Sequence, residues 1–81
     1  MEVFSTSRFE QRFEALPSTV QKRIQDAVEK IGQNPYHGKK LSGSLEGDYS
    51  WRIGQYRILY MIYQQKIYLE SVAHRKEIYR A

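Results

Sequence analysis

Apolar residues recur at helical spacing in the first part of the chain. Phe9, Phe13 and Leu16 lie at positions i, i+4 and i+7, so they fall on one face of a helix. The preceding Ser7-Arg-Phe-Glu10 matches a capping box, in which the serine and glutamate side chains accept from free backbone N–H groups at a helix start. Pro17 should end this helix, because proline lacks a backbone N–H.

A second helical stripe begins directly after Pro17. Ser18-Thr-Val-Gln21 repeats the capping-box pattern, and Gly32 predicts the C-terminal end of the helix. The apolar positions of this stripe are Val20, Ile24, Ala27, Val28 and Ile31. Because so few residues separate the two stripes, we expect an antiparallel helical hairpin whose apolar faces pack on a sheet.

Alternation with a period of two replaces the helical pattern in the second part of the chain. The segment from Asp48 to Tyr63 is the densest run of β-branched and aromatic residues, which favour strands. Tyr49, Trp51 and Ile53 share one face of the first strand, and the intervening polar residues share the other. The run predicts a hairpin with a tight turn at Gly54-Gln55.

The remaining segments complete a small sheet. Glu2 to Ser5 holds two strand formers, and residues 34–47 predict a loop that Leu41 and Leu45 anchor to the core. Strands are expected at residues 2–5, 49–53, 56–63 and 67–73, followed by a short tail that forms a turn or a short helix. The order β-α-α-β-β-β predicts an α+β domain, with a two-helix hairpin packed on one face of a mostly antiparallel four-stranded sheet.

Length and composition limit the class of protein. Eighty-one residues suffice for one domain, which we place at residues 1–81. The chain has no cysteine and two histidines, so we predict no disulfide, no metal site and no cofactor. No apolar run reaches the roughly 20 residues that span a bilayer, so we expect a soluble, unprocessed cytoplasmic protein without a membrane partner.

Charge favours a polyanionic partner. The formal net charge is +4, and the positive excess lies from Lys39 onward, whereas residues 1–35 are balanced. A basic surface of this kind suits nucleic acid or a strongly acidic protein.

Arg57 is the residue that the pattern explains least. It interrupts a strand that is otherwise apolar on both faces, and an unpaired buried charge is strongly unfavourable. Arg57 must therefore either pair with an acid such as Glu70 or Asp48 or line a cleft. Arg52, on the neighbouring strand, is either a solvated cation or a second member of the same cleft.

Two segments resemble a known family. They are Tyr49-Ser-Trp-Arg-Ile-Gly-Gln-Tyr-Arg-Ile-Leu-Tyr60 and Ser71-Val-Ala-His-Arg-Lys-Glu-Ile-Tyr-Arg80. Together with the order of elements, they resemble the RelE/ParE superfamily of type II toxin–antitoxin toxins, on its RelE side, over essentially the whole chain. The resemblance implies a RelE-like fold and a ribosome-dependent endoribonuclease that cuts messenger RNA in the ribosomal A site. It also implies a cognate antitoxin that wraps and neutralises the toxin, and contact with DNA only through the antitoxin complex.

The resemblance also implies which residues act. Its basic active-site positions correspond to Arg52, Arg57 and Arg75, and its C-terminal aromatic residue corresponds to Tyr79, which could stack on a base. His74 stands beside Arg75 and is the first candidate for proton transfer, because histidine changes charge near neutral pH. A displaced lysine such as Lys76 is the alternative base. Ser50 stands where well-studied members carry a lysine.

Arginine suits metal-independent cleavage of RNA by the 2′-hydroxyl, because its planar fork binds phosphate oxygens and stays charged. Further contacts to the RNA backbone of the ribosome or messenger are predicted at Lys39, Lys40 and Lys76.

Alternatives remain for the residues and for the function. His74 could cap the last strand, Tyr79 could cover the edge of the core, and His37 is interpreted as a surface residue. A protein of the same fold could instead inhibit DNA gyrase, as ParE toxins do, or it could be a catalytically weak relative that acts mainly by binding its antitoxin.

Overall fold

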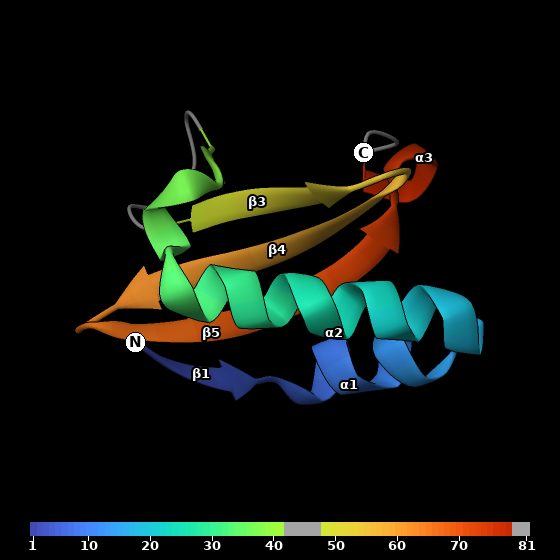
Figure 1. Ribbon diagram of the computed structural model, residues 1–81, viewed down its shortest axis with the longest axis horizontal. Coiled ribbons are helices and arrows are strands. Elements are labelled where there is room, and N and C mark those ends of the chain that lie inside the picture. The colour runs from blue at the N-terminus through green and yellow to red at the C-terminus, as the bar shows by residue number, and fades with distance from the viewer. Residues whose placement is uncertain (42–47, 79–81) are drawn as a thin grey trace.

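A five-stranded sheet with two helices packed on it forms the protein (Figure 1). This computed structural model describes the chain except for residues 42–47 and 79–81. The elements are β1 (Glu2–Ser5), α1 (Ser7–Glu14), α2 (Ser18–Gln33), the 3-10 turn η1 (Pro35–His37), β2 (Lys39–Lys40), β3 (Asp48–Ile53), β4 (Tyr56–Tyr63), β5 (Lys66–His74) and α3 (Arg75–Ile78). The predicted α+β class and the order of the main elements are confirmed.

The sheet has one strand more than the sequence predicts. Its order is β1-β5-β4-β3-β2, with β1 parallel to β5 and the other neighbours antiparallel. Lys39 and Lys40, which we expected in a loop, pair with Ser50 and Tyr49 and form β2. A two-residue strand is too short to show alternation, so only its pairing with the edge of β3 reveals it.

The first helix begins at a different cap from the predicted one. The side chain of Thr6, not Ser7, accepts a hydrogen bond from the backbone N–H of Phe9 at 3.2 Å. The Thr6 hydroxyl also donates to the carbonyl of Leu69 at 2.9 Å. Thr6 therefore caps α1 and ties it to β5, a tertiary contact that the local sequence does not predict.

The capping box predicted for the second helix is also wrong. Pro17 occupies the cap position without a side-chain hydrogen bond, and Ser18 is already helical. The amide of Gln21 instead donates to the carbonyls of Phe13 and Leu16, at 3.1 and 3.0 Å. Gln21 thus satisfies the free carbonyls at the end of α1. The helix continues past the predicted stop at Gly32 to Gln33.

The core lies between the helices and one face of the sheet. Helix α1 packs against β5, and α2 packs against β3. The buried cluster consists of Phe9, Ile24, Ala27, Ile31, Tyr49, Ile58, Tyr60, Ile67, Leu69 and Val72. The apolar stripes read from the sequence therefore supply the core, as predicted.

Tyr60 joins this core to the turn η1. Its ring is fully buried, and its hydroxyl donates to the carbonyl of Pro35 at 2.6 Å. Burial raises the pKa of Tyr60 to about 12, so the hydroxyl stays protonated and able to donate. A Cβ on Gly38 would overlap this hydroxyl. The absence of a side chain at Gly38 lets the chain run from η1 into β2 across Tyr60.

Candidate functional site

The register of the β3–β4 hairpin sets two arginines opposite each other. Arg52 pairs with Arg57, next to the pairing of Ile53 with Tyr56. Residues that alternate with them, such as Ile58, belong to the core, so both arginines lie on the sheet face opposite the helices. Two like charges in direct cross-strand opposition are unfavourable for folding alone. Their pairing is therefore more typical of an anion-binding site.

Arg75 joins the pair from the end of the last strand. Its backbone N–H donates to the carbonyl of Gln55 in the hairpin turn at 2.6 Å, which holds the start of α3 beside that turn. Arg75, Arg52 and Arg57 line a cleft of about 260 Å³ together with Gly54 and Tyr56. The described residues that line this cleft include no carboxylate, so it is a strongly positive site.

A buried hydroxyl orients the central arginine. Nη1 of Arg57 donates to Oγ of Ser50 at 3.0 Å, and Ser50 is only 3% exposed. Arg52 is held separately, since its Nε donates to the carbonyl of Gly54 at 3.1 Å. Ser50 therefore supplies a fixed acceptor for Arg57.

A second hollow continues the cleft toward the edge of the sheet. It has a volume of about 300 Å³ and is lined by His37, Gly38, Lys39, Ser50, Trp51, Arg52 and Arg57. Arg52 and Arg57 border both hollows, so we describe the two together as the arginine groove. The groove runs from Arg75 to His37.

His37 is a groove residue that the sequence interpretation missed. It was expected to be a plain surface residue, and it is exposed, but its ring lies 5.6 Å from the ring of Trp51 beside the two arginines. Its position depends on the pairing of β2 with β3, which no sequence pattern predicts. The one available signal is that His37 lies close to the two consecutive lysines in the chain.

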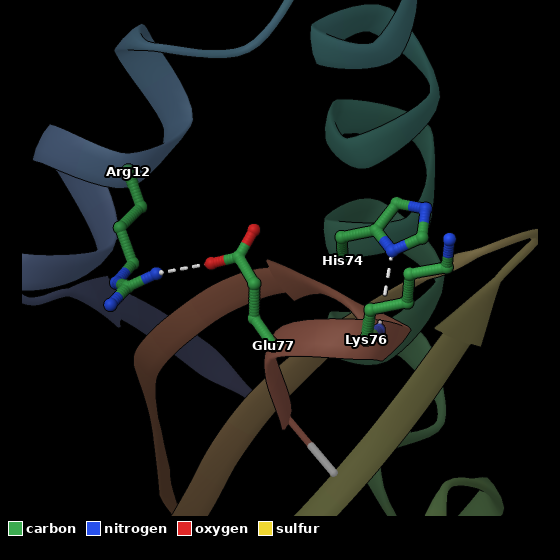
Figure 2. A network of polar contacts seen from close by, with 4 residues as sticks. All are labelled: Arg12, His74, Lys76 and Glu77. Carbon is green, nitrogen blue, oxygen red and sulfur yellow. Dashed lines mark hydrogen bonds and ion pairs between the residues drawn. The ribbon is translucent and has the colours of Figure 1, made fainter. Parts of the chain in front are cut away.

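His74 contacts Tyr56, which lines the cleft, but it is not itself a lining residue. It pairs with Tyr56 across β4 and β5, and its ring meets that of Tyr56 edge to face at 5.3 Å. Its Nδ1 accepts from the backbone N–H of Lys76 at 3.2 Å (Figure 2). It lines neither hollow. By register it shares the helix-covered face with Ile58 and Val72. It caps the first turn of α3, whereas the structural alternative expected it to cap the last strand.

The other residues that were predicted to contact RNA do not all lie at the groove. Lys39 lines the groove, whereas Lys40 follows it in β2 and is exposed. Lys76 is exposed on α3 beside His74. Tyr79 lies outside the described residues.

An ion pair fixes α3 from the other side. Nη1 of Arg12 on α1 lies 3.2 Å from Oε2 of Glu77 (Figure 2). Figure 2 shows Glu77 directed toward Arg12 and His74 directed toward the opposite side of α3. The side chains of Arg12 and Glu77 are 39% and 59% exposed, so the contact orients α3 more than it stabilises the fold.

Among the described residues, no cluster of three or more side chains suited to hold a metal ion is present. None of the helices in that part of the chain is long and apolar enough to cross a membrane.

Solved structures of similar fold include chains from toxin–antitoxin complexes. The RelB–RelE complex from Methanococcus jannaschii contains a chain with 26% identity and a TM-score of 0.78, and the match covers 95% of each chain. The RelBE2 complex from Mycobacterium tuberculosis contains one with 28% identity and a TM-score of 0.81, over 91% of this chain and 96% of that chain. The E. coli RelBE complex, at 19% identity and a TM-score of 0.79, covers 90% and 94% and shows the same fold.

Sequence comparison places the chain in one family. No significant match is found among curated protein sequences. Residues 3–79, however, match the family described as the ParE toxin of type II toxin-antitoxin system, parDE. This match, over nearly the whole length, confirms the resemblance to the RelE/ParE superfamily, and the chain therefore belongs to the ParE toxin family of type II toxin–antitoxin systems.

Proposed function

We propose that this toxin is a ribosome-dependent endoribonuclease that cuts messenger RNA in the A site and so inhibits translation. The observation that supports this most directly is the arginine groove, in which Arg52, Arg57 and Arg75 converge on one cleft. A cleft lined by guanidinium groups suits a phosphodiester, because each fork can donate two hydrogen bonds to phosphate oxygens.

The reaction we propose needs no metal ion. The 2′-hydroxyl of the RNA attacks the adjacent phosphorus, and negative charge grows on the phosphate oxygens. Arg57 and Arg75 stabilise that charge, and Arg52 contacts the phosphate or the leaving oxygen. Tyr79 would stack on an unpaired base, and Lys39, Lys40 and Lys76 would hold the RNA backbone.

The partner that controls this activity is a cognate antitoxin. The two relatives at 26% and 28% identity were solved with RelB antitoxins, which supports such a partner here. Binding of that antitoxin across the arginine groove would block access of messenger RNA.

Mutation of the groove tests the nuclease. Induced protein should arrest growth and leave messenger RNA cut within codons at stalled ribosomes. Arg57→Ala and Arg75→Ala should each lower cleavage by about 100-fold, because a donor to the transition state is lost. Primer extension on a reporter transcript measures this. Lys22→Ala removes an exposed positive charge of α2 and should leave cleavage unchanged. Undiminished cleavage in Arg75→Ala would contradict the assignment.

Inhibition of DNA gyrase is the second candidate, because the matching family is named for ParE. Relaxed plasmid DNA with intact messenger RNA in the same induced cells would favour it. Intact messenger RNA, normal supercoiling and retained antitoxin binding would instead indicate a toxin relative that acts by binding alone.

A further inference from the structure

We propose that His37 is the proton acceptor for the 2′-hydroxyl in this cleavage reaction. The inference rests on the proposed nuclease function and identifies a residue for one of its steps.

The backbone of His37 is held by a hydrogen bond, whereas its side chain is exposed. Its N–H donates to the carbonyl of Asn34 at 3.1 Å, and the same short turn is held to the core by the bond from Tyr60 to Pro35. The imidazole itself is exposed and rests against Trp51. A rigid turn thus presents a solvent-accessible imidazole at one end of the arginine groove.

The neighbours of His37 supply phosphate binding but not proton acceptance. Among the described residues, the charged groups that line its hollow are Lys39, Arg52 and Arg57, from β2, β3 and β4. Lysine and arginine side chains are normally protonated at neutral pH and cannot accept another proton. The hydroxyl of Ser50 is buried against Arg57. Among the described side chains that line the groove, the imidazole is therefore the one suited to general-base catalysis.

His74 is less suited to this step. Its register places it on the helix-covered side of the sheet, and its Nδ1 already accepts from the backbone of Lys76. A phosphate held between Arg52 and Arg57 would lie in the hollow that His37 lines, whereas His74 lines neither hollow.

The step balances without any additional reactant. The 2′ O–H bond breaks, its proton moves to a nitrogen of neutral His37, and the oxygen uses its electron pair to bond to phosphorus. The bond from phosphorus to the 5′-oxygen then breaks, and that oxygen leaves with the electron pair and takes a proton from water. The imidazolium of His37 gives its proton to the hydroxide that this leaves, which restores neutral imidazole and water. The products are a 2′,3′-cyclic phosphate and a 5′-hydroxyl.

Single-turnover cleavage on programmed ribosomes tests the inference, with rates measured between about pH 5 and 8. The unaltered protein should lose rate at acidic pH as imidazole becomes protonated. His37→Gln should cut about 100-fold more slowly and lack this acid dependence. Imidazole added to His37→Ala should restore part of the rate. Lys22→Ala, which changes an exposed residue of α2, is the control and should keep both its rate and its pH dependence. Loss of the acid dependence in His74→Gln instead would overturn the inference.

Undiminished cleavage by His37→Gln would overturn the inference and leave the nuclease intact. A loss that is equal at every pH and that imidazole does not relieve would also overturn it, because such a loss indicates only a structural role. Thermal unfolding of each variant checks that the fold is kept. No cleavage by the unaltered protein would instead overturn the proposed function, and this inference with it.

Discussion

Arg57 and Ser50 show how one polar pair can be placed in an otherwise apolar part of a small sheet. The guanidinium reaches a buried serine hydroxyl at 3.0 Å and at the same time borders both hollows of the groove. A buried hydrogen bond to a charged donor is stronger than one between neutral groups. The pair therefore fixes the direction of the arginine before any ligand arrives.

Ser50→Ala should reduce cleavage more than it harms folding. Loss of the acceptor leaves Arg57 less well oriented, and a bond of this kind corresponds to about a tenfold or greater loss of rate. Single-turnover cleavage and urea unfolding measure the two effects. Ser71→Ala is the control, because Ser71 is also buried but lines neither hollow. Equal rates for the two variants would show that Ser50 does not position Arg57.

His37 and His74 differ in their position on the sheet for a geometric reason. Successive residues of a strand point to opposite faces, so His74 shares the core face with Val72 by register, although it directly precedes Arg75 in the chain. His37 is distant from the arginines in sequence and reaches them through the edge of the sheet. Nearness in sequence thus favours His74, whereas the structure places His37 among the residues that line the groove.

At the scale of elements, the local sequence pattern failed to predict short features that depend on contacts with distant segments. Helix α1 is capped by Thr6 because that hydroxyl also bonds to β5. Strand β2 forms because β3 offers an unpaired edge. In both cases the local residues are compatible with more than one conformation, and a contact with a distant segment of the chain selects one of them.

Thr6 and Ser7 are neighbouring candidates for the cap of α1, so the stabilities of their alanine variants can be compared directly. Thr6→Ala should lower the free energy of unfolding by about 1 to 2 kcal/mol, since both the cap and the bond to Leu69 are lost. Ser7→Ala, which replaces a residue already inside the helix, should change it much less. Urea unfolding of the two variants decides between the caps, and the reverse order of stability would favour Ser7.

At the scale of the whole molecule, charge is divided between the faces and edges of the sheet. Part of the positive charge behind the net value of +4 lies in the arginine groove, at one end of the β3–β4 hairpin. Asp48 and Glu70 lie farther along the sheet. Burial raises the pKa of Glu70, and nearby Asp48 raises it further. One oxygen of Asp48 is buried without a hydrogen-bond partner among the described residues, so this carboxyl pair is unfavourable when both groups are charged.

Stability should therefore depend on pH through Glu70. A carboxyl group whose pKa is raised by folding binds its proton more tightly in the folded state. Its contribution is most favourable below the ordinary pKa of a glutamate, and it is lost as pH rises through the folded-state value. Glu70→Gln should thus raise the free energy of unfolding at neutral pH and have a smaller effect at mildly acidic pH.

Urea unfolding at the two pH values measures this effect. Glu29→Gln, on the exposed face of α2, is the control and should show no such difference. A destabilised Glu70→Gln at neutral pH would contradict the prediction.

The sequence by itself determined the elements that rest on periodic burial. The stripes of α1 and α2 and the strands from Asp48 onward follow from spacing of apolar residues, because a continuous core requires those positions to share a face. The segments that match the toxin family also directed attention to Arg52, Arg57 and Arg75, which the fold brings to one cleft.

Only the tertiary structure decided how the polar residues are shared between the two faces. Register places Arg52 opposite Arg57 and turns His74 away, and pairing at the sheet edge brings in His37. These placements depend on contacts between distant segments, which periodicity within one segment cannot specify. The sequence therefore determined which charges are present, and the pairing of strands determined which of them meet.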